Sequence, residues 1–141
     1  AADAFCIRAE HILCVLRRLR VMAPVFQMTG ATHQAAFTNG PNVLHFEEDI
    51  GRHNAVDKVL GRCLMQRTDT RSGALLVTGR VNGEMVLKAL RQGVPVVAGR
   101  GAATARAVDL ARERRLTLVG FARGDRMNIY SAPERIEREV S

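Results

Sequence analysis

From Val43 to Phe121 the sequence alternates short apolar runs with stretches of helical periodicity. Between the first two runs, for example, Val56, Val59 and Leu60 share one face of a helix. The order strand, helix, strand, helix, strand, helix, strand builds a largely parallel sheet joined by right-handed crossovers. The pattern therefore predicts an α/β fold with three layers (α/β/α): a mixed, mostly parallel sheet with helices on both faces.

The complete set of expected strands comprises seven apolar runs. They are Val25–Met28, His33–Thr38, Val43–Phe46, Ala74–Val77, Pro95–Ala98, Leu116–Phe121 and Met127–Tyr130. Turn residues such as Asn39-Gly40-Pro41 favour a hairpin among the first three runs. An amphipathic helix is expected at Asp3–Arg20, with Cys14 nearly opposite its apolar stripe, and the charged tail from Glu134 to Ser141 is the stretch expected to be disordered.

The length of 141 residues and a hydrophobic content of 47% suit one well-filled core, so residues 1–141 are expected to form a single domain. No apolar run is long enough to span a bilayer, and the first residues lack the pattern of a secretory signal. We therefore expect a cytoplasmic location and no membrane partner.

The formal net charge of +7 points to an anionic partner, and nearly all of the basic residues are arginines. A guanidinium group binds phosphate through two hydrogen bonds, although a GC-rich genome enriches arginine as well. The chain has one Tyr and no Trp, which leaves no aromatic platform for single-stranded bases. We expect no nucleic-acid partner.

The cysteines Cys6, Cys14 and Cys63 have no metal-ligand spacing, so neither zinc nor any other metal site is expected. Cys63 lies on the apolar face of its expected helix and is interpreted as an unreactive core residue. The sequence lacks a GxSxG elbow, a Walker-type GxxxxGK[ST] loop and the HxE and PCxxC motifs of zinc deaminases. These absences favour a binding protein, and no catalytic residue is assigned.

Four connections that follow expected strands combine glycine with arginine. They are Glu47–Asn54, Thr78–Gly83, Gly99–Thr104 and Phe121–Arg126. In an open parallel sheet, ligands bind at the carboxyl ends of the strands, where helix N-termini also point. Glycine lets the backbone approach a ligand, and arginine binds phosphate oxygens. Four such connections on one edge favour a nucleotide or pyrophosphate site over ordinary turns.

The first connection also carries acidic groups and a histidine, each with two interpretations. Glu48 could contact a ribose, a guanine base or Mg²⁺, or could instead pair with arginine. Asp49 is expected to cap the helix that begins near Arg52. His53 could shuttle a proton or contact phosphate, but a structural hydrogen bond to a neighbouring loop is as plausible. His33 could reach the same edge from a turn before its strand.

Several of these segments together resemble the FdhD family of sulfur carriers for formate dehydrogenase. The resemblance covers almost the whole chain, and its most specific part is a string from Glu48 to Lys58, Glu-Asp-Ile-Gly-Arg-His-Asn-Ala-Val-Asp-Lys. It is also carried by the segments Thr29–Ala36, Thr78–Arg80, Glu84–Lys88 and Leu116–Phe121.

The resemblance implies a cytidine-deaminase-like fold without zinc that binds the bis-molybdopterin guanine dinucleotide form of the molybdenum cofactor. In such proteins sulfur passes from a cysteine desulfurase to a persulfide on a Cys-x-x-Cys loop, and then to the cofactor for formate dehydrogenase. The expected partners are thus a cysteine desulfurase, formate dehydrogenase and the guanine nucleotide moiety of the cofactor, with a homodimer as the expected assembly.

The residues expected to bind the cofactor combine the strand-end connections with the family's cofactor-binding segment. They are Phe121, Ala122, Arg123, Gly124, Asp125, Arg126, Thr78, Gly79, Arg80, Arg100, Gly101, Glu48, Arg52, His53 and His33.

Two departures from the family pattern bear on these expectations. The Cys-x-x-Cys loop would lie before Ala1, and neither Cys6 nor Cys14 matches its position, so this chain is not expected to form the persulfide. Gly101–Thr104 stands where relatives often have Ser-Ala-Pro-Thr.

Two other functions remain open. The chain could be a zinc-free, deaminase-like enzyme acting on a nucleotide, with His53 and Glu48 as acid and base. It could also be an interaction module whose arginines dock acidic proteins.

Overall fold

The computed structural model describes residues 5–138. The helices are α1 (Ala9–Met22), α2 (Pro24–Thr29), α3 (Arg52–Met65), α4 (Gly83–Arg91) and α5 (Ala105–Arg114), with short 3-10 turns η2 (Thr70–Ser72) and η3 (Pro133–Arg135). The strands are β1 (Ile7–Arg8), β2 (His33–Thr38), β3 (Val43–Asp49), β4 (Ala74–Val77), β5 (Val96–Gly99), β6 (Thr117–Arg123), β7 (Arg126–Ile129) and β8 (Ile136–Glu137).

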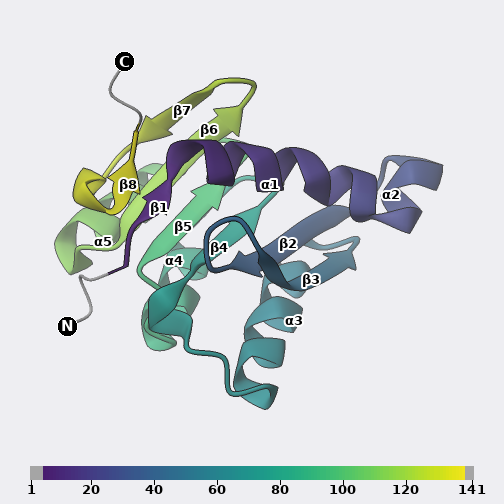
Figure 1. Ribbon diagram of the computed structural model, residues 1–141, viewed down its shortest axis with the longest axis horizontal. Coiled ribbons are helices and arrows are strands. Elements are labelled where there is room, and N and C mark those ends of the chain that lie inside the picture. The colour runs from purple at the N-terminus through teal and green to yellow at the C-terminus, as the bar shows by residue number, and fades with distance from the viewer. Residues whose placement is uncertain (1–4, 139–141) are drawn as a thin grey trace.

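A six-stranded sheet in the order β3-β2-β4-β5-β6-β7 forms the middle layer (Figure 1). Strands β4, β5 and β6 are parallel, β2 is antiparallel to both β3 and β4, and β7 is antiparallel to β6. Strand β3 therefore runs in the same direction as β4, β5 and β6. The carboxyl ends of these four strands, the connections that follow them and the start of β2 at His33 lie on one edge of the sheet, hereafter the rim.

Each face of the sheet has its own apolar core. Helices α3, α4 and α5 cover one face, whereas α1 crosses the other (Figure 1). Alternation along β2 sends Phe37 into the first core and Ala36 into the second. The three-layer α/β/α arrangement with helices on both faces, predicted from the sequence, is confirmed.

The first helix differs from its expected range of Asp3–Arg20. It begins at Ala9 and ends at Met22, and Asp3 lies outside the described residues. Ile7 instead belongs to β1, where it is buried and pairs with Ile136 of β8. This pairing between distant residues replaces the first helical turn that the local pattern suggested. Cys14, which lies opposite the apolar stripe, is exposed on this chain.

The strand expected at Val25–Met28 is wrong, because these residues form α2. Pro24 stands in the first turn, where proline favours a helix, and a carboxylate from β3 accepts hydrogen bonds from that turn. A run of four apolar residues does not by itself distinguish a strand from a helix. The hairpin is therefore formed by β2 and β3 alone.

Two further boundaries differ from expectation. Strand β3 continues past Phe46 to Asp49, so the acidic residues belong to the strand. In the tail expected to be disordered from Glu134 to Ser141, residues 134–137 instead form part of η3 and then β8, whereas residues 139–141 lie outside the described residues. The segment 134–137 is held there because Arg135, which is buried, donates to the carbonyl oxygen of Arg115 at 2.7 Å.

Candidate functional site at the rim of the sheet

Backbone hydrogen bonds join three of the connections at the rim. The Gly101 N–H donates to the carbonyl oxygen of Gly79 at 3.3 Å, and the Phe121 N–H donates to that of Gly101 at 2.8 Å. A Cβ atom at Gly101 would lie 3.2 Å from the backbone nitrogen of Arg80, so a side chain there would crowd the neighbouring connection. The strand-end loops thus form one continuous surface.

The first connection and the start of β2 join the same surface. A Cβ atom at Gly79 would lie 3.2 Å from Nδ1 of His33 and 3.3 Å from Cδ of Arg52, which places both side chains against this loop. His53 Nε2 accepts a hydrogen bond from Nδ2 of Asn82 at 3.0 Å, because Oδ1 of Asn82 is already engaged by a backbone N–H in the first turn of α4. His53 therefore has the structural contact to a neighbouring loop that was one of its two interpretations.

Within residues 5–138, the rim concentrates arginines that form no ion pair with a carboxylate. Burial, followed by the charges of Arg52 and Arg20, lowers the pKa of His33. Burial and the charge of Arg100 lower the pKa of Arg20. Among residues 5–138, none of the ion pairs includes Arg20, Arg52 or Arg100. Arginines that repel one another and disfavour protonation of a neighbouring histidine form a site whose energy an anion would lower.

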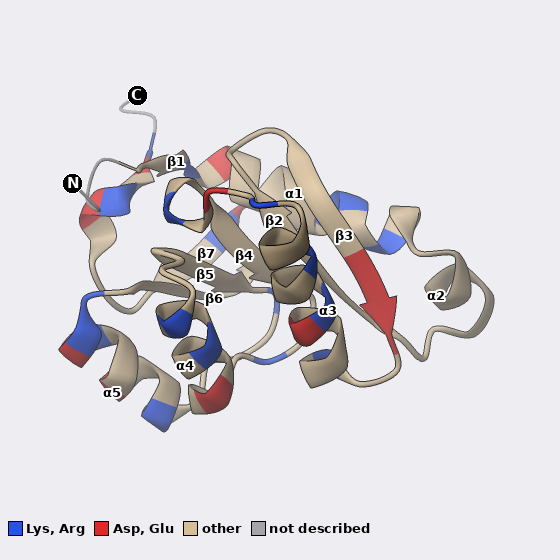
Figure 2. Ribbon diagram, turned by 90° about the horizontal axis from the view of Figure 1, so that it is seen from below, with Lys and Arg blue, Asp and Glu red and all other residues tan. Residues whose placement is uncertain are grey.

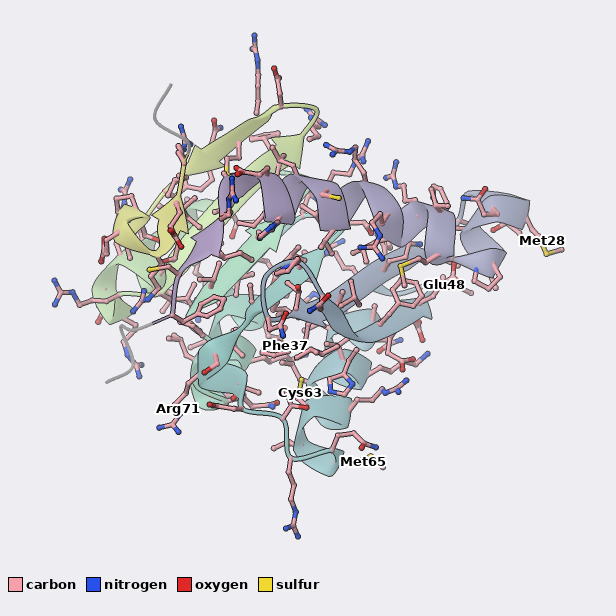
Figure 3. All side chains as sticks on the ribbon, in the orientation of Figure 1. Met28, Phe37, Glu48, Cys63, Met65 and Arg71 are labelled. Carbon is pink, nitrogen blue, oxygen red and sulfur yellow. The ribbon has the colours of Figure 1, made fainter. Side chains whose placement is uncertain are left out.

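Glu48, one of the predicted site residues, holds α2 in place. Its carboxylate accepts hydrogen bonds from the N–H groups of Val25 at 3.2 Å and Phe26 at 2.7 Å, and from the hydroxyl of Thr32. Burial alone would raise the pKa of Glu48, but these hydrogen bonds outweigh it and the pKa is lowered. Figure 3 shows Glu48 beside α2. Because both oxygens are used, the carboxylate has little capacity left for a ligand.

The other acidic groups of β3 are also engaged within the protein, and Figure 2 shows them as the red end of that strand. Asp49 Oδ2 lies 2.6 Å from Nζ of Lys58, and Oδ1 accepts from the Gly51 N–H at 3.0 Å. The hydrogen bond from Lys58, with that from Gly51, lowers the pKa of Asp49 to about 2. The helix α3 begins at Arg52 as expected, but Gly51 occupies the N-cap position, so Asp49 supports the preceding turn instead of capping the helix.

The segment Phe121–Arg126 is divided between two places. Phe121 has φ of +50°, a left-handed backbone conformation that is strained for an aromatic residue. The guanidinium of Arg123 lies 5.3 Å from the centroid of its ring. Because the Phe121 N–H is bound to the third connection, this stacked pair stays at the rim.

Asp125 and Arg126 do not join the cation cluster. They line an open pocket of about 510 Å³ together with Glu10 and Leu13 of α1. Glu10 is ten residues from Arg20 along this helix, roughly 15 Å at the helical rise of about 1.5 Å per residue. The pocket therefore places Asp125 and Arg126 beside the first turns of α1, whereas Arg20 lies in its last turn.

Three other residues predicted for the site take part in the packing and hydrogen bonding of the fold. The hydroxyl of Thr78 accepts from the Gln34 N–H at 2.9 Å, between β4 and β2. Ala122 is buried in the core under α1. Gly124 is at the tip of the β6–β7 hairpin with φ of +64°, and its carbonyl oxygen accepts from Nη1 of Arg17.

A second pocket, of about 490 Å³, adjoins the rim where α4 and α5 begin. Asn82 and Thr104 cap these helices through hydrogen bonds to the N–H groups of Met85 and Ala107. The side chain of Arg106 lies across Gly83, where a Cβ atom would be 2.8 Å from its Cδ. Sequence reasoning missed Arg106, which lines this pocket, and Arg20, which lies near His33 and Arg100, because both are contributed by helices and not by a strand-end loop.

The sequence also led to predictions about the cysteines and about metal ligands. Burial raises the pKa of Cys63 to about 11, which fits the unreactive core residue predicted for it. Cys6 and Cys14 are exposed. In the part of the chain from residue 5 to 138, no three His, Cys, Asp or Glu side chains are grouped so that they could hold a metal ion. The same residues include no helix with the length and apolar character that a membrane crossing needs.

Comparison with known proteins identifies relatives over nearly the whole chain. The model of the FdhD/NarQ family matches residues 1–137. The sulfur carrier protein FdhD of Methanothermobacter thermautotrophicus is 42% identical over 130 residues, which cover 92% of this chain and 52% of that protein. The protein of the same name from Staphylococcus haemolyticus is 39% identical over 128 residues, 91% of this chain and 48% of that protein.

A solved structure supports the same relationship. It is a crystal structure from Desulfotalea psychrophila, of a protein assigned as a formate dehydrogenase accessory protein, and it superposes with a TM-score of 0.87 at 35% identity. The match covers 94% of this chain and 57% of that one. The chain spans about half the length of the curated relatives that it matches.

Proposed function

Since the chain belongs to the FdhD/NarQ family, we propose that it is the cofactor-binding part of a sulfur carrier protein that serves formate dehydrogenase. In this proposal the rim binds the guanine nucleotide moiety of the bis-molybdopterin guanine dinucleotide cofactor. A cysteine desulfurase supplies the sulfur, and the cofactor, when bound, supplies the molybdenum centre that receives it.

The observation that carries the proposal is the group of arginines around His33, which form no ion pair with a carboxylate among the described residues. His33, Arg52 and Arg100 lie at the rim, and the connections there carry backbone N–H groups at helix starts. Phosphate oxygens fit such a donor set, because guanidinium groups bind them bidentately and helix N-termini favour negative charge. The task of these residues is to bind and orient the nucleotide.

The cysteines are not proposed as sulfur carriers. Cys63 is buried and its pKa is raised, so little thiolate forms at neutral pH. Cys6 and Cys14 are exposed, but neither matches the family's sulfur-carrying position. Incubation with a desulfurase and labelled cysteine should therefore leave no persulfide on this chain.

The enzyme and docking interpretations receive less support. Both oxygens of Glu48 are bound by α2 and Thr32, and His53 Nε2 is bound by Asn82, so the proposed acid and base are already engaged. No specific contact favours a docking surface for acidic proteins. The homodimer and the cytoplasmic location stay predictions.

Titration calorimetry tests the proposal. Wild-type protein should bind GDP more tightly than ADP, and Arg100→Ala should weaken GDP binding by roughly tenfold or more, since hydrogen bonds to charged groups contribute about 1.5–3 kcal/mol. The matched control is Arg114→Ala, which removes the same charge from the exposed end of α5 and should leave affinity within about twofold. A folded wild-type sample that binds neither nucleotide would refute the proposal.

A further inference from the structure

Arg20 reaches the rim from the opposite layer of the fold. It lies in the last turn of α1, the helix that crosses the face of the sheet not covered by α3, α4 and α5 (Figure 1). Its carbonyl oxygen accepts hydrogen bonds from Nε2 of Gln27 at 2.7 Å and from the Ala23 N–H at 3.3 Å. The turn between α1 and α2 therefore fixes the backbone of Arg20.

The side chain of Arg20 is oriented without a carboxylate. Its guanidinium lies 4.9 Å from the centroid of the Phe26 ring, and its Nε is buried without a hydrogen-bond partner. The Phe26 N–H is in turn bound to the carboxylate of Glu48 at 2.7 Å. A guanidinium that stacks through its face keeps the N–H groups along its edge available for a planar or tetrahedral anion.

The surroundings of Arg20 are positively charged. Burial and then the charge of Arg100 lower the pKa of Arg20, and the charge of Arg20 adds to burial and to the charge of Arg52 in lowering the pKa of His33. Arg20 thus adds to the field of the rim and has no ion-pair partner among the described residues. Partly desolvated, mutually repelling cations gain most from an anion bound between them.

We propose that Arg20 is a phosphate-binding residue of the rim, contributed by α1 and oriented by Phe26 and Glu48. The proposal rests on the proposed nucleotide binding and deepens it. It assigns to Glu48 an indirect part in binding: the carboxylate positions Phe26, and the Phe26 ring positions the guanidinium.

The experiment is titration calorimetry with GDP, inorganic pyrophosphate and guanosine. Arg20→Ala should weaken GDP and pyrophosphate binding by roughly tenfold or more and leave guanosine binding unchanged, because guanosine has no phosphate. Arg18→Ala is the matched control, since Arg18 belongs to the same helix but lines a groove beside β3 and not the rim. Its affinity for GDP should stay within about twofold.

A double-mutant cycle tests how Arg20 is oriented. Phe26→Leu should weaken GDP binding when Arg20 is present, and should have no further effect in the Arg20→Ala background, because the ring acts through the guanidinium. Arg20→Lys keeps the charge without the planar face and should retain part of the affinity. This variant also serves if Arg20→Ala is not folded by circular dichroism.

The outcomes separate this inference from the proposed function. If wild-type protein binds GDP and Arg20→Ala binds it equally well, Arg20 is not a ligand residue, while nucleotide binding at the rim stands. An equal loss for guanosine and GDP would show a structural role and overturn the inference. If the wild-type protein binds neither GDP nor pyrophosphate, both the inference and the proposed function fall.

Discussion

Replacing Glu48 by alanine should release α2 from the sheet while leaving the six strands in place. The substitution removes an acceptor from two backbone N–H groups and one hydroxyl. A lost helix cap costs about 1 kcal/mol, and a hydrogen bond to a charged group contributes about 1.5–3 kcal/mol. Val25 is exposed, so its N–H can bind water instead. We therefore expect a destabilisation of roughly 2 kcal/mol, below the sum of these contributions.

The assay combines chemical unfolding with amide hydrogen exchange. Glu47→Gln is the matched control, because it removes a neighbouring carboxylate that forms only a partly exposed ion pair with Arg62. It should cost less than about 1 kcal/mol. In Glu48→Ala the amides of Val25 and Phe26 should exchange much faster, whereas those of β4 should change far less. Equal destabilisation in the two variants, with unchanged exchange at Val25 and Phe26, would refute this account of α2.

Three further predictions concern titrating groups. Burial and neighbouring arginines lower the pKa of His33, so a bound phosphate should raise this pKa, and the affinity for GDP should increase as pH falls through the interval between the His33 pKa values of the bound and the free protein. NMR titrations of His33 that coincide with and without GDP would contradict this. Cys63 is buried and its pKa is raised to about 11, so it should react with a thiol reagent only on unfolding, in contrast to the exposed Cys6 and Cys14. Rapid labelling of all three thiols in the native protein would count against this prediction. Asp49 has a pKa of about 2 against an ordinary value of 3.8, so its stabilising contribution is complete above about pH 4 and is lost as pH falls through about 2. In urea unfolding, Asp49→Asn should destabilise the protein at pH 5 and by less at pH 3, and an equal loss of stability at both pH values would disprove this prediction.

The central part of the fold could be predicted because its signals are local. Between β4 and β6, each pair of successive short apolar strands is joined by a crossover with one amphipathic helix, and the handedness of such strand–helix–strand units is nearly fixed. The pairing of Ile7 with Ile136 could not be predicted, since strands of two residues have no period. Helix α2 was missed because its first turn is held by Glu48, a residue 22 positions from Phe26 in the sequence.

In the candidate site, too, the residues placed by local signals could be predicted and those placed by tertiary packing could not. The positions of Arg52 and Arg100 follow from strand direction alone, because loops after parallel strands share an edge. The contribution of Arg20 depends on how α1 crosses the sheet, which the helix pattern does not contain. The position of Arg126 beside the first turns of α1 depends on the β6–β7 hairpin and its irregular register, which no turn motif in the sequence specified.

The reversed strand β2 makes the two layers interdependent. It is inserted between β3 and β4, and adjacent residues such as Ala36 and Phe37 fill opposite cores. A shift of its register by one residue would exchange these side chains and move His33 away from Gly79 at the same time. Packing errors on either side of the sheet would thus misalign the residues at the rim, and a sequence change far from the rim could alter the nucleotide affinity that we propose for it.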